Sequence, residues 1–338
     1  MASPATQHAD AASGAPDTPG NFDRDTAVRR RGVTDGDGAP ADGDVVLYDA
    51  EVSPAWRAGR GPHGGYLAAM LLRALTDAVA DPGRTPRSLT IHYARAPQPG
   101  PVTIAVTLER KGRSLSTLSA RMEQNGRLQA LALAAFSVPW RAAEIAELPL
   151  PDVAPPDAER MPVKGSHPAT PLFLRNLILQ LRIGAVPFTG STAPMEVGAW
   201  LGLPRNGQPG PAQPGLPAPA GSAQPGVEKP GLRPLDPPAL ALFSDALFSP
   251  PFVRLPEPAV TPTIDLTIHF RRDLADGFAD GIDPDLRELC FARFSSTVVH
   301  DGFFEEDGVI WAADGTVLAQ SRQLAIVLPF DPSEAAQA

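Results

Sequence analysis

The sequence predicts an α+β fold in which two similar units each wrap an antiparallel sheet around one long central helix. The first observation is a repeated segment: residues 88–95 read Ser-Leu-Thr-Ile-His-Tyr-Ala-Arg, and residues 265–272 read Asp-Leu-Thr-Ile-His-Phe-Arg-Arg. Strand-like segments follow each copy in the same order. Copies separated by about half the chain indicate two similar domains rather than a short-period solenoid.

The expected elements of the first half are a strand, a helix and four further strands, at 45–52, 66–79, 88–95, 102–109, 114–124 and 128–138. The helix is apolar around most of its circumference, which predicts that it is buried. The second half repeats this order with strands at 174–183 and 195–201, a helix at 237–248, and strands at 263–271, 286–299, 302–312 and 317–328.

The composition is that of a globular protein with a net negative charge. The 338 residues are 43% hydrophobic and 20% charged, with a net charge of −9, which argues against general nucleic-acid binding. No apolar run approaches the roughly 18 residues of a membrane helix. The N-terminus lacks the layout of a secretory signal, so the cytoplasm is the expected location. The single cysteine, Cys290, gives no cysteine-rich metal site.

Proline and glycine mark the domain boundaries. The chain has 40 prolines, about twice the usual share. We expect a disordered tail at 1–42, an N-terminal domain at 43–140, a linker at 141–169 and a C-terminal domain at 170–330, followed by a short tail at 331–338. A Pro/Gly-rich insertion at about 206–230 interrupts the second domain, because such a segment cannot pair in a sheet.

Several motifs in a fixed order carry a resemblance to a known family. They are Gly61-Pro62-His63-Gly64-Gly65-Tyr66, Arg87 through Tyr93, Gly112-Arg113-Ser114, Ser244-Asp245-Ala246, Thr263-Ile264-Asp265 and Gln320-Ser321-Arg322-Gln323. The sequence resembles acyl-CoA thioesterase II, a thioesterase-like family with a double hotdog fold, over roughly 45–203 and 232–330.

The resemblance implies hydrolysis of an acyl-CoA thioester to free acid and coenzyme A. It assigns the catalytic roles to Asp245, Thr263 and Gln323, which would hold and activate one water. It implies no metal and no cofactor, acyl-CoA as the partner, a role in fatty acid metabolism, and homodimers of double-hotdog subunits as a family expectation.

The same residues can be weighed without the family. Asp245 falls in the last turn of the predicted helix, where the negative end of the helix dipole disfavours a carboxylate; the alternative is an ordinary surface Asp. Gln323 aligns with Ala134 of the first copy, so we expect a polar site in the second copy alone. Alternation places Thr263 on one strand face with Asp265, Thr267 and His269. Thr261 and Gln320 remain open as substitutes.

The remaining candidates concern substrate binding. His63, Gly64, Gly65 and Tyr66 open the first helix, where glycines let a substrate approach backbone N–H groups that polarise its carbonyl; a tight turn without ligand is the alternative. Phe243 and Phe248 are expected to border the acyl chain. A non-catalytic protein that binds acyl-CoA on the same fold is the alternative function.

Overall fold

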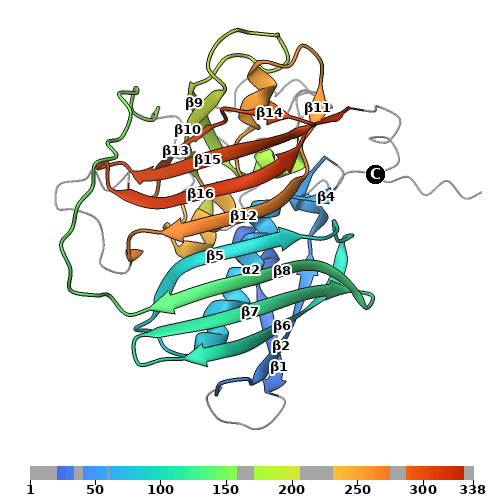
Figure 1. Ribbon diagram of the computed structural model, residues 1–338, viewed down its shortest axis with the longest axis vertical. Helices are drawn as coiled ribbons and strands as arrows, with labels where there is room; N and C mark the ends of the chain where they lie inside the picture. The colour runs from blue at the N-terminus through green and yellow to red at the C-terminus, as the bar shows by residue number, and fades with distance from the viewer. Residues whose placement is uncertain are drawn as a thin grey trace, which may run out of the picture.

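One continuous antiparallel sheet organises the computed structural model, which describes residues 21–33, 41–59, 61–157, 171–205, 231–274 and 287–330 (Figure 1). In this described part the sheet has 13 strands, in the order β1-β2-β6-β7-β8-β5-β12-β16-β15-β13-β10-β9, with β14 beside β15. The expectation of two separate sheets is therefore wrong, because β5 of the first half pairs with β12 of the second.

The strands agree with most of the expected ranges. The first half contributes β1 (Val28–Val33), β2 (Val45–Val52), β5 (Thr85–Tyr93), β6 (Gly100–Lys111), β7 (Leu115–Gln124) and β8 (Arg127–Ser137). The second half contributes β9 (Ile178–Ile183), β10 (Glu196–Gly202), β12 (Thr263–Phe270), β13 (Cys290–Ser295), β14 (Val299–His300), β15 (Phe303–Ala312) and β16 (Val317–Ile326). Two-residue strands form β3 (Arg57–Ala58) with β4 (Gly61–Pro62), and β11 (Ala259–Val260) with β17 (Leu328–Pro329).

The repeated segments meet at the centre of the sheet. Thr90 of β5 lies opposite Thr267 of β12, its own equivalent in the repeat, and their Oγ1 atoms are 3.1 Å apart. On either side, Ser88 lies opposite His269 and His92 opposite Asp265. Ser88 and Asp265 are equivalent in the repeat, as are His92 and His269, so the two pairs are related to each other by a local twofold axis through Thr90 and Thr267. The duplication seen in the sequence is thus also a symmetry of the sheet.

The long helix α2 (Gly64–Val79) forms the centre of the core. It contacts strands β5, β6, β7 and β8 on one side and α3 (Pro237–Phe243) on another. Partners on two sides explain its lack of a polar face. Its largest fully buried side chains are Tyr66, Met70, Leu71 and Leu72, and burial of one such side chain stabilises the fold by roughly 1.5–3 kcal/mol.

The second helix is shorter than the sequence suggests. Asp236 caps α3 by accepting from the N–H of Ala239 at 2.8 Å, and the helix ends at Phe243 rather than at the expected residue 248. After Phe243 the chain tightens into turns in which Asp245 and Ala246 donate to the carbonyl oxygens three residues before them. Pro250 and Pro251 then form the first turn of a 3₁₀ helix, η4 (Pro250–Val253). The second long central helix is therefore a wrong prediction.

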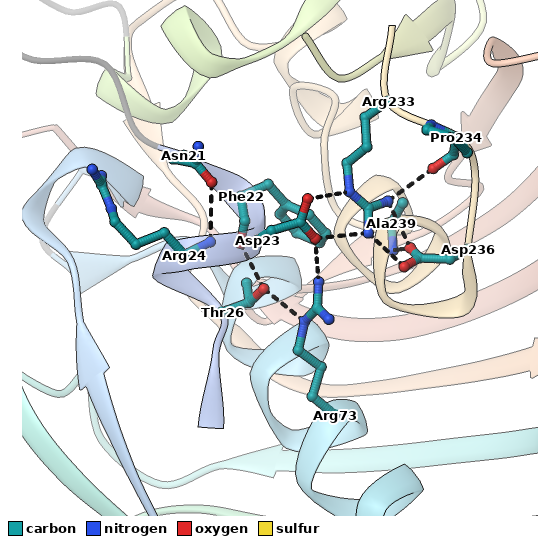
Figure 2. Close-up of polar contacts among 10 residues, drawn as sticks. All are labelled: Asn21, Phe22, Asp23, Arg24, Thr26, Arg73, Arg233, Pro234, Asp236 and Ala239. Atoms are coloured by element: carbon teal, nitrogen blue, oxygen red, sulfur yellow. Dashed lines mark hydrogen bonds and ion pairs between the residues drawn. The ribbon is translucent and has the colours of Figure 1, made fainter. Parts of the chain in front are cut away.

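An ordered N-terminal segment clamps the two halves together (Figure 2). Asp23 of α1 (Phe22–Asp25) pairs with Arg73 of α2 and with Arg233 ahead of α3 at 2.7 and 2.8 Å. The Arg233 guanidinium lies 5.0 Å from the ring centroid of Phe22. Residues 21–33 thus correct the prediction of a disordered tail at 1–42, because acidic and aromatic groups in this segment, such as Asp23 and Phe22, contact side chains of the folded core.

The predicted linker is described as far as residue 157. It runs along the second half, where Trp200 donates its indole N–H to the carbonyl oxygen of Ala154 and Trp311 donates to that of Leu148, both at 2.9 Å. The rest of the linker, the Pro/Gly-rich insertion and the C-terminal tail lie outside the described residues. Among the helices of the described ranges, none has the length and apolarity needed to cross a membrane.

Candidate active site

Asp245 lies in the turn after α3, with its carboxylate at the N-terminus of α2. Its Oδ2 accepts a hydrogen bond of 2.9 Å from the backbone N–H of Gly65, and the side chain is 15% exposed. The positive end of the α2 dipole stabilises the carboxylate there. The expected position at the unfavourable end of its own helix is therefore wrong, because α3 ends earlier and the turn carries Asp245 to another helix.

Two glycines allow α2 to approach the end of α3 closely. A Cβ on Gly65 would lie 2.5 Å from the carbonyl oxygen of Leu242, and a Cβ on Gly64 would lie 2.8 Å from Oδ2 of Asp245. The contact at Gly65 is with backbone and excludes a side chain there, whereas a side chain at Gly64 would displace the carboxylate of Asp245. The Gly65 amide, expected to polarise a substrate carbonyl, donates to Asp245 instead.

His63 is held beside Asp245 from two directions. Its Nδ1 accepts from the N–H of Tyr66 at 3.2 Å as the N-cap of α2, which assigns the proton of the neutral ring to Nε2. Nε2 lies 2.6 Å from the carbonyl oxygen of Asp245 and 3.4 Å from Oδ2. The ring stacks on Phe173 with centroids 4.0 Å apart. His63 thus fixes the turn that carries the carboxylate.

Tyr93 of β5 is a neighbour that sequence reasoning missed. Its hydroxyl donates to the carbonyl oxygen of Gly64 at 2.9 Å. Desolvation, and then the charge of Asp245, raise the pKa of Tyr93 well above its ordinary value, so its hydroxyl remains a neutral donor. Tyr93 belongs to the repeated segment 88–95, and this repetition was the sequence feature that could have identified it as a candidate.

A β-bulge brings Thr263 and Gln323 together. Asp265 and Thr263 lie opposite consecutive residues of β16, so one residue between them is extra. An extra residue reverses the face on which the following side chains lie. Thr263 therefore shares a face with Gln323 and donates to its Oε1 at 2.9 Å. The predicted common face of Thr263 with Asp265 is wrong for this reason.

The two substitute residues have other partners. Thr261 lies 2.7 Å from the hydroxyl of Ser249, oxygen to oxygen. Gln320 accepts from Nε of Arg271 at 2.7 Å, on the exposed side of the strand. The pair that the structure brings together is thus Thr263 and Gln323.

Glu306 of β15 extends this pair and was not among the residues expected from the sequence. Gln323 donates from Nε2 to its Oε1 at 2.6 Å, and Glu306 is 3% exposed. Burial, and then the charge of Asp245, raise the pKa of Glu306 well above its ordinary value. Residues 305–307 are all acidic and resemble a solvated run. The usable signal is alternation, since Glu306 occupies the same strand face as the buried Phe304.

The aromatic candidates divide into two groups. Phe243 is fully buried at the end of α3, and Phe248 is partly buried after the Asp245 turn. Tyr66 belongs to a separate cluster: its hydroxyl donates to the carbonyl oxygen of Asp25 at 2.7 Å, and its ring stacks on Trp56 at 5.4 Å. The Tyr66 side chain therefore faces the N-terminal segment, while its backbone N–H contacts the candidate His63.

Both halves of the chain contribute to the arrangement. His63, Gly65 and Tyr93 come from the first half, and Asp245 comes from the second. The polar residues Asp245, Thr263 and Gln323 come from the second copy, and the first half adds the groups that hold Asp245, because α2 of the first half packs against α3 of the second.

Comparison with known proteins agrees with this division into two repeats. Residues 52–137 match the family model described as the acyl-CoA thioesterase N-terminal domain, and residues 223–327 match the acyl-CoA thioesterase C-terminal domain. An uncharacterised protein of Mycobacterium tuberculosis is 26% identical over 312 residues, which cover 89% of this chain and 97% of that protein.

Solved structures show the fold. A protein of unknown function with the hotdog fold from Alicyclobacillus acidocaldarius is 23% identical, with a TM-score of 0.68, and the match covers 92% of this chain and 98% of that one. An acyl-CoA thioesterase II from Mycobacterium marinum is 17% identical, with a TM-score of 0.61 and coverage of 92% and 99%. The chain has the hotdog fold and belongs to the acyl-CoA thioesterase family.

Proposed function

We propose that this protein hydrolyses an acyl-CoA thioester to the free acid and coenzyme A. The hydrogen bond between Thr263 and Gln323 carries the proposal, because it joins two of the polar groups that a water-holding site needs. Asp245 is the third, and its charge acts on Glu306, which is the next partner of Gln323. We infer that the chain is a fused pair of hotdog units, which the local twofold axis at Thr90 and Thr267 supports.

The hydrogen bonds suggest how one water is held. The hydroxyl proton of Thr263 points to Gln323, so the lone pairs of Thr263 Oγ1 are oriented to accept from the water. Oδ2 of Asp245 accepts from Gly65, and we assign the second water proton to Oδ1. Asp245 keeps 15% of its side-chain surface exposed, so water reaches it.

In the proposed reaction the water oxygen attacks the thioester carbonyl carbon while Asp245 removes a proton from the water. The carbon–sulfur bond then breaks, and the coenzyme A thiolate takes up the proton. A positioned general base of this kind contributes roughly 10²- to 10⁴-fold to a rate. Every step uses side chains and water, so the proposed hydrolysis is independent of a metal. Phe243 and Phe248, which flank Asp245 in sequence, are proposed to border the acyl chain.

The test is release of coenzyme A from a panel of acyl-CoA substrates that spans short, medium and long chains. A thiol reagent follows the reaction, and calorimetry with the same compounds measures binding. The proposal expects turnover of at least one member of the panel. Binding without turnover across the whole panel would instead support a non-catalytic acyl-CoA-binding protein.

A further inference from the structure

Glu306 is a buried acid that takes part in no step of the proposed reaction. It ends a hydrogen-bonded chain that crosses three neighbouring strands, from Thr263 on β12 through Gln323 on β16 to Glu306 on β15. Its second oxygen, Oε2, is buried and has no hydrogen-bond partner in the described part of the chain. An unpartnered polar atom in the core is destabilising, so the fold alone does not account for it.

The first half shows what the fold requires at these positions. The strand registers identify the first-half equivalents of Thr263, Gln323 and Glu306 as Pro86, Ala134 and Leu118. All three are buried, and none carries a polar side chain. Leu118 and Ala134 face each other across β7 and β8, as Glu306 and Gln323 do across β15 and β16. Where the first half has three buried apolar side chains, the second half thus has three polar side chains joined by hydrogen bonds.

A glutamine amide has a donor end and an acceptor end, and its neighbours decide which end faces where. With Glu306 accepting from Nε2, the carbonyl oxygen of Gln323 faces Thr263 and accepts its hydroxyl proton. With leucine at position 306, the amide would lose this anchor and could turn over. Thr263 would then accept a proton from Gln323, and its hydroxyl proton would point toward the water.

We propose that Glu306 is a positioning residue that fixes the amide orientation of Gln323, and that it affects catalysis only through Gln323. This inference rests on the proposed function. Burial and the charge of Asp245 both favour a neutral Glu306, and a neutral acid still accepts from Gln323 at its carbonyl oxygen. Glu306 therefore orients the amide without placing a second charge beside Asp245.

The first test is a double-mutant cycle on thioester hydrolysis with wild type, Glu306→Leu, Gln323→Leu and the double variant. Glu306→Leu should lower kcat roughly ten- to hundredfold with KM changed less than about threefold, and the double variant should be no slower than Gln323→Leu. Wild-type kcat in Glu306→Leu would overturn the proposal. So would a loss in the double variant equal to the product of the single losses, because independent effects multiply.

Two further variants separate positioning from folding. Glu306→Gln keeps an acceptor for Gln323 and should recover most of the kcat that Glu306→Leu loses. Asp307→Leu also replaces an acid by leucine, but on the exposed face of the same strand. This control should keep the wild-type kcat. If Glu306→Leu does not fold, Glu306→Met replaces it in the cycle. A kcat that follows thermal stability across all these variants would mean a structural role only.

The second test does not depend on activity. The side-chain amide signal of Gln323 in nitrogen-15 NMR is identified by its loss in Gln323→Leu. Wild type and Glu306→Gln should show slow hydrogen exchange at this amide, and Glu306→Leu or Glu306→Met should show fast exchange. Equal protection in all of them would refute the role of Glu306. If wild type releases no coenzyme A, the proposed function is refuted. The role of Glu306 in orienting Gln323 is still decided by the exchange rate of the amide.

Discussion

Asp245, from the second half of the chain, accepts a hydrogen bond of 2.9 Å from the backbone amide of Gly65, the second residue of the helix in the first half. This contact anchors the acid of the second repeat at the N-terminus of the helix α2 of the first. It explains why the glycines of the first half and the acid of the second belong to one candidate site. The following predictions test this arrangement.

Gly64→Ala should reduce activity more than stability. The new Cβ would lie 2.8 Å from Oδ2 of Asp245, so the carboxylate must move, and a small displacement of a catalytic group costs about tenfold or more in rate. Alanine is itself a good helix residue, so the melting temperature should change little. Gly231→Ala is the matched control, because its Cβ meets only ordinary contacts at 3.6 Å or more. Unchanged kcat in Gly64→Ala would contradict the close contact.

Thr263→Val should lower kcat by about ten- to hundredfold, because the hydroxyl that accepts from the water is lost while the shape is kept. Thr263→Ser should retain most of the activity. Thr261→Val makes the same change two residues away, where the hydroxyl contacts Ser249, and should leave kcat at the wild-type value. Steady-state kinetics of the three variants decides between the two threonines; a loss in Thr261→Val alone would reverse the assignment.

Gln323→Leu should also lower kcat strongly, since Thr263 loses its acceptor and Glu306 its donor. Gln320→Leu removes a glutamine from the opposite face of the same strand, where it pairs with Arg271. This control should affect stability by less than about 1 kcal/mol and should not change kcat. Equal kinetic losses in the two variants would count against a site on the Gln323 face.

Asp23→Asn should lower stability at neutral pH but not in acid. Hydrogen bonds and ion pairs with Arg233, and then Arg73, hold the pKa of Asp23 below its ordinary value, which is about 3.9. A lowered pKa stabilises the folded state above the unfolded value, and this contribution is lost as pH falls through the folded pKa. The ion pairs are partly exposed, so the effect should be at most about 1 kcal/mol.

Denaturant unfolding of wild type and Asp23→Asn at pH 7 and pH 3 measures this difference. Glu257→Gln, an exposed acid of the second half, serves as the control and should unfold like wild type at both values. A stability difference of Asp23→Asn that grows as the pH falls would contradict the clamp.

Alternation and turn residues in the sequence predict much of this structure. The helix expected at 66–79 and most strands were found, and Asn125 and Gly126 have the positive φ values of 52° and 71° that a two-residue hairpin requires. These features depend on local patterns. The family resemblance also named Thr263 and Gln323, which the structure joins by a hydrogen bond.

The missed features depend on contacts between distant segments. The bulge beside Thr263 changes one side-chain direction without a local signal, because neither Gly nor Pro stands at its extra residue. The early end of α3 lets Asp245 reach α2, which no helix pattern within one repeat indicates. Glu306 lies in an acidic run, and its contact with Gln323 depends on the pairing of β15 with β16, which no pattern within one strand indicates.

The most direct test of the central claim, a hydrolase in which Asp245 activates water, is the rate of coenzyme A release by Asp245→Asn. Asparagine keeps an oxygen that can accept from Gly65 but cannot remove a proton from water. With the best acyl-CoA substrate of the wild type, the account predicts a kcat at least about 10²-fold lower, with an unchanged melting temperature. A folded Asp245→Asn variant that releases coenzyme A at the wild-type rate would contradict it.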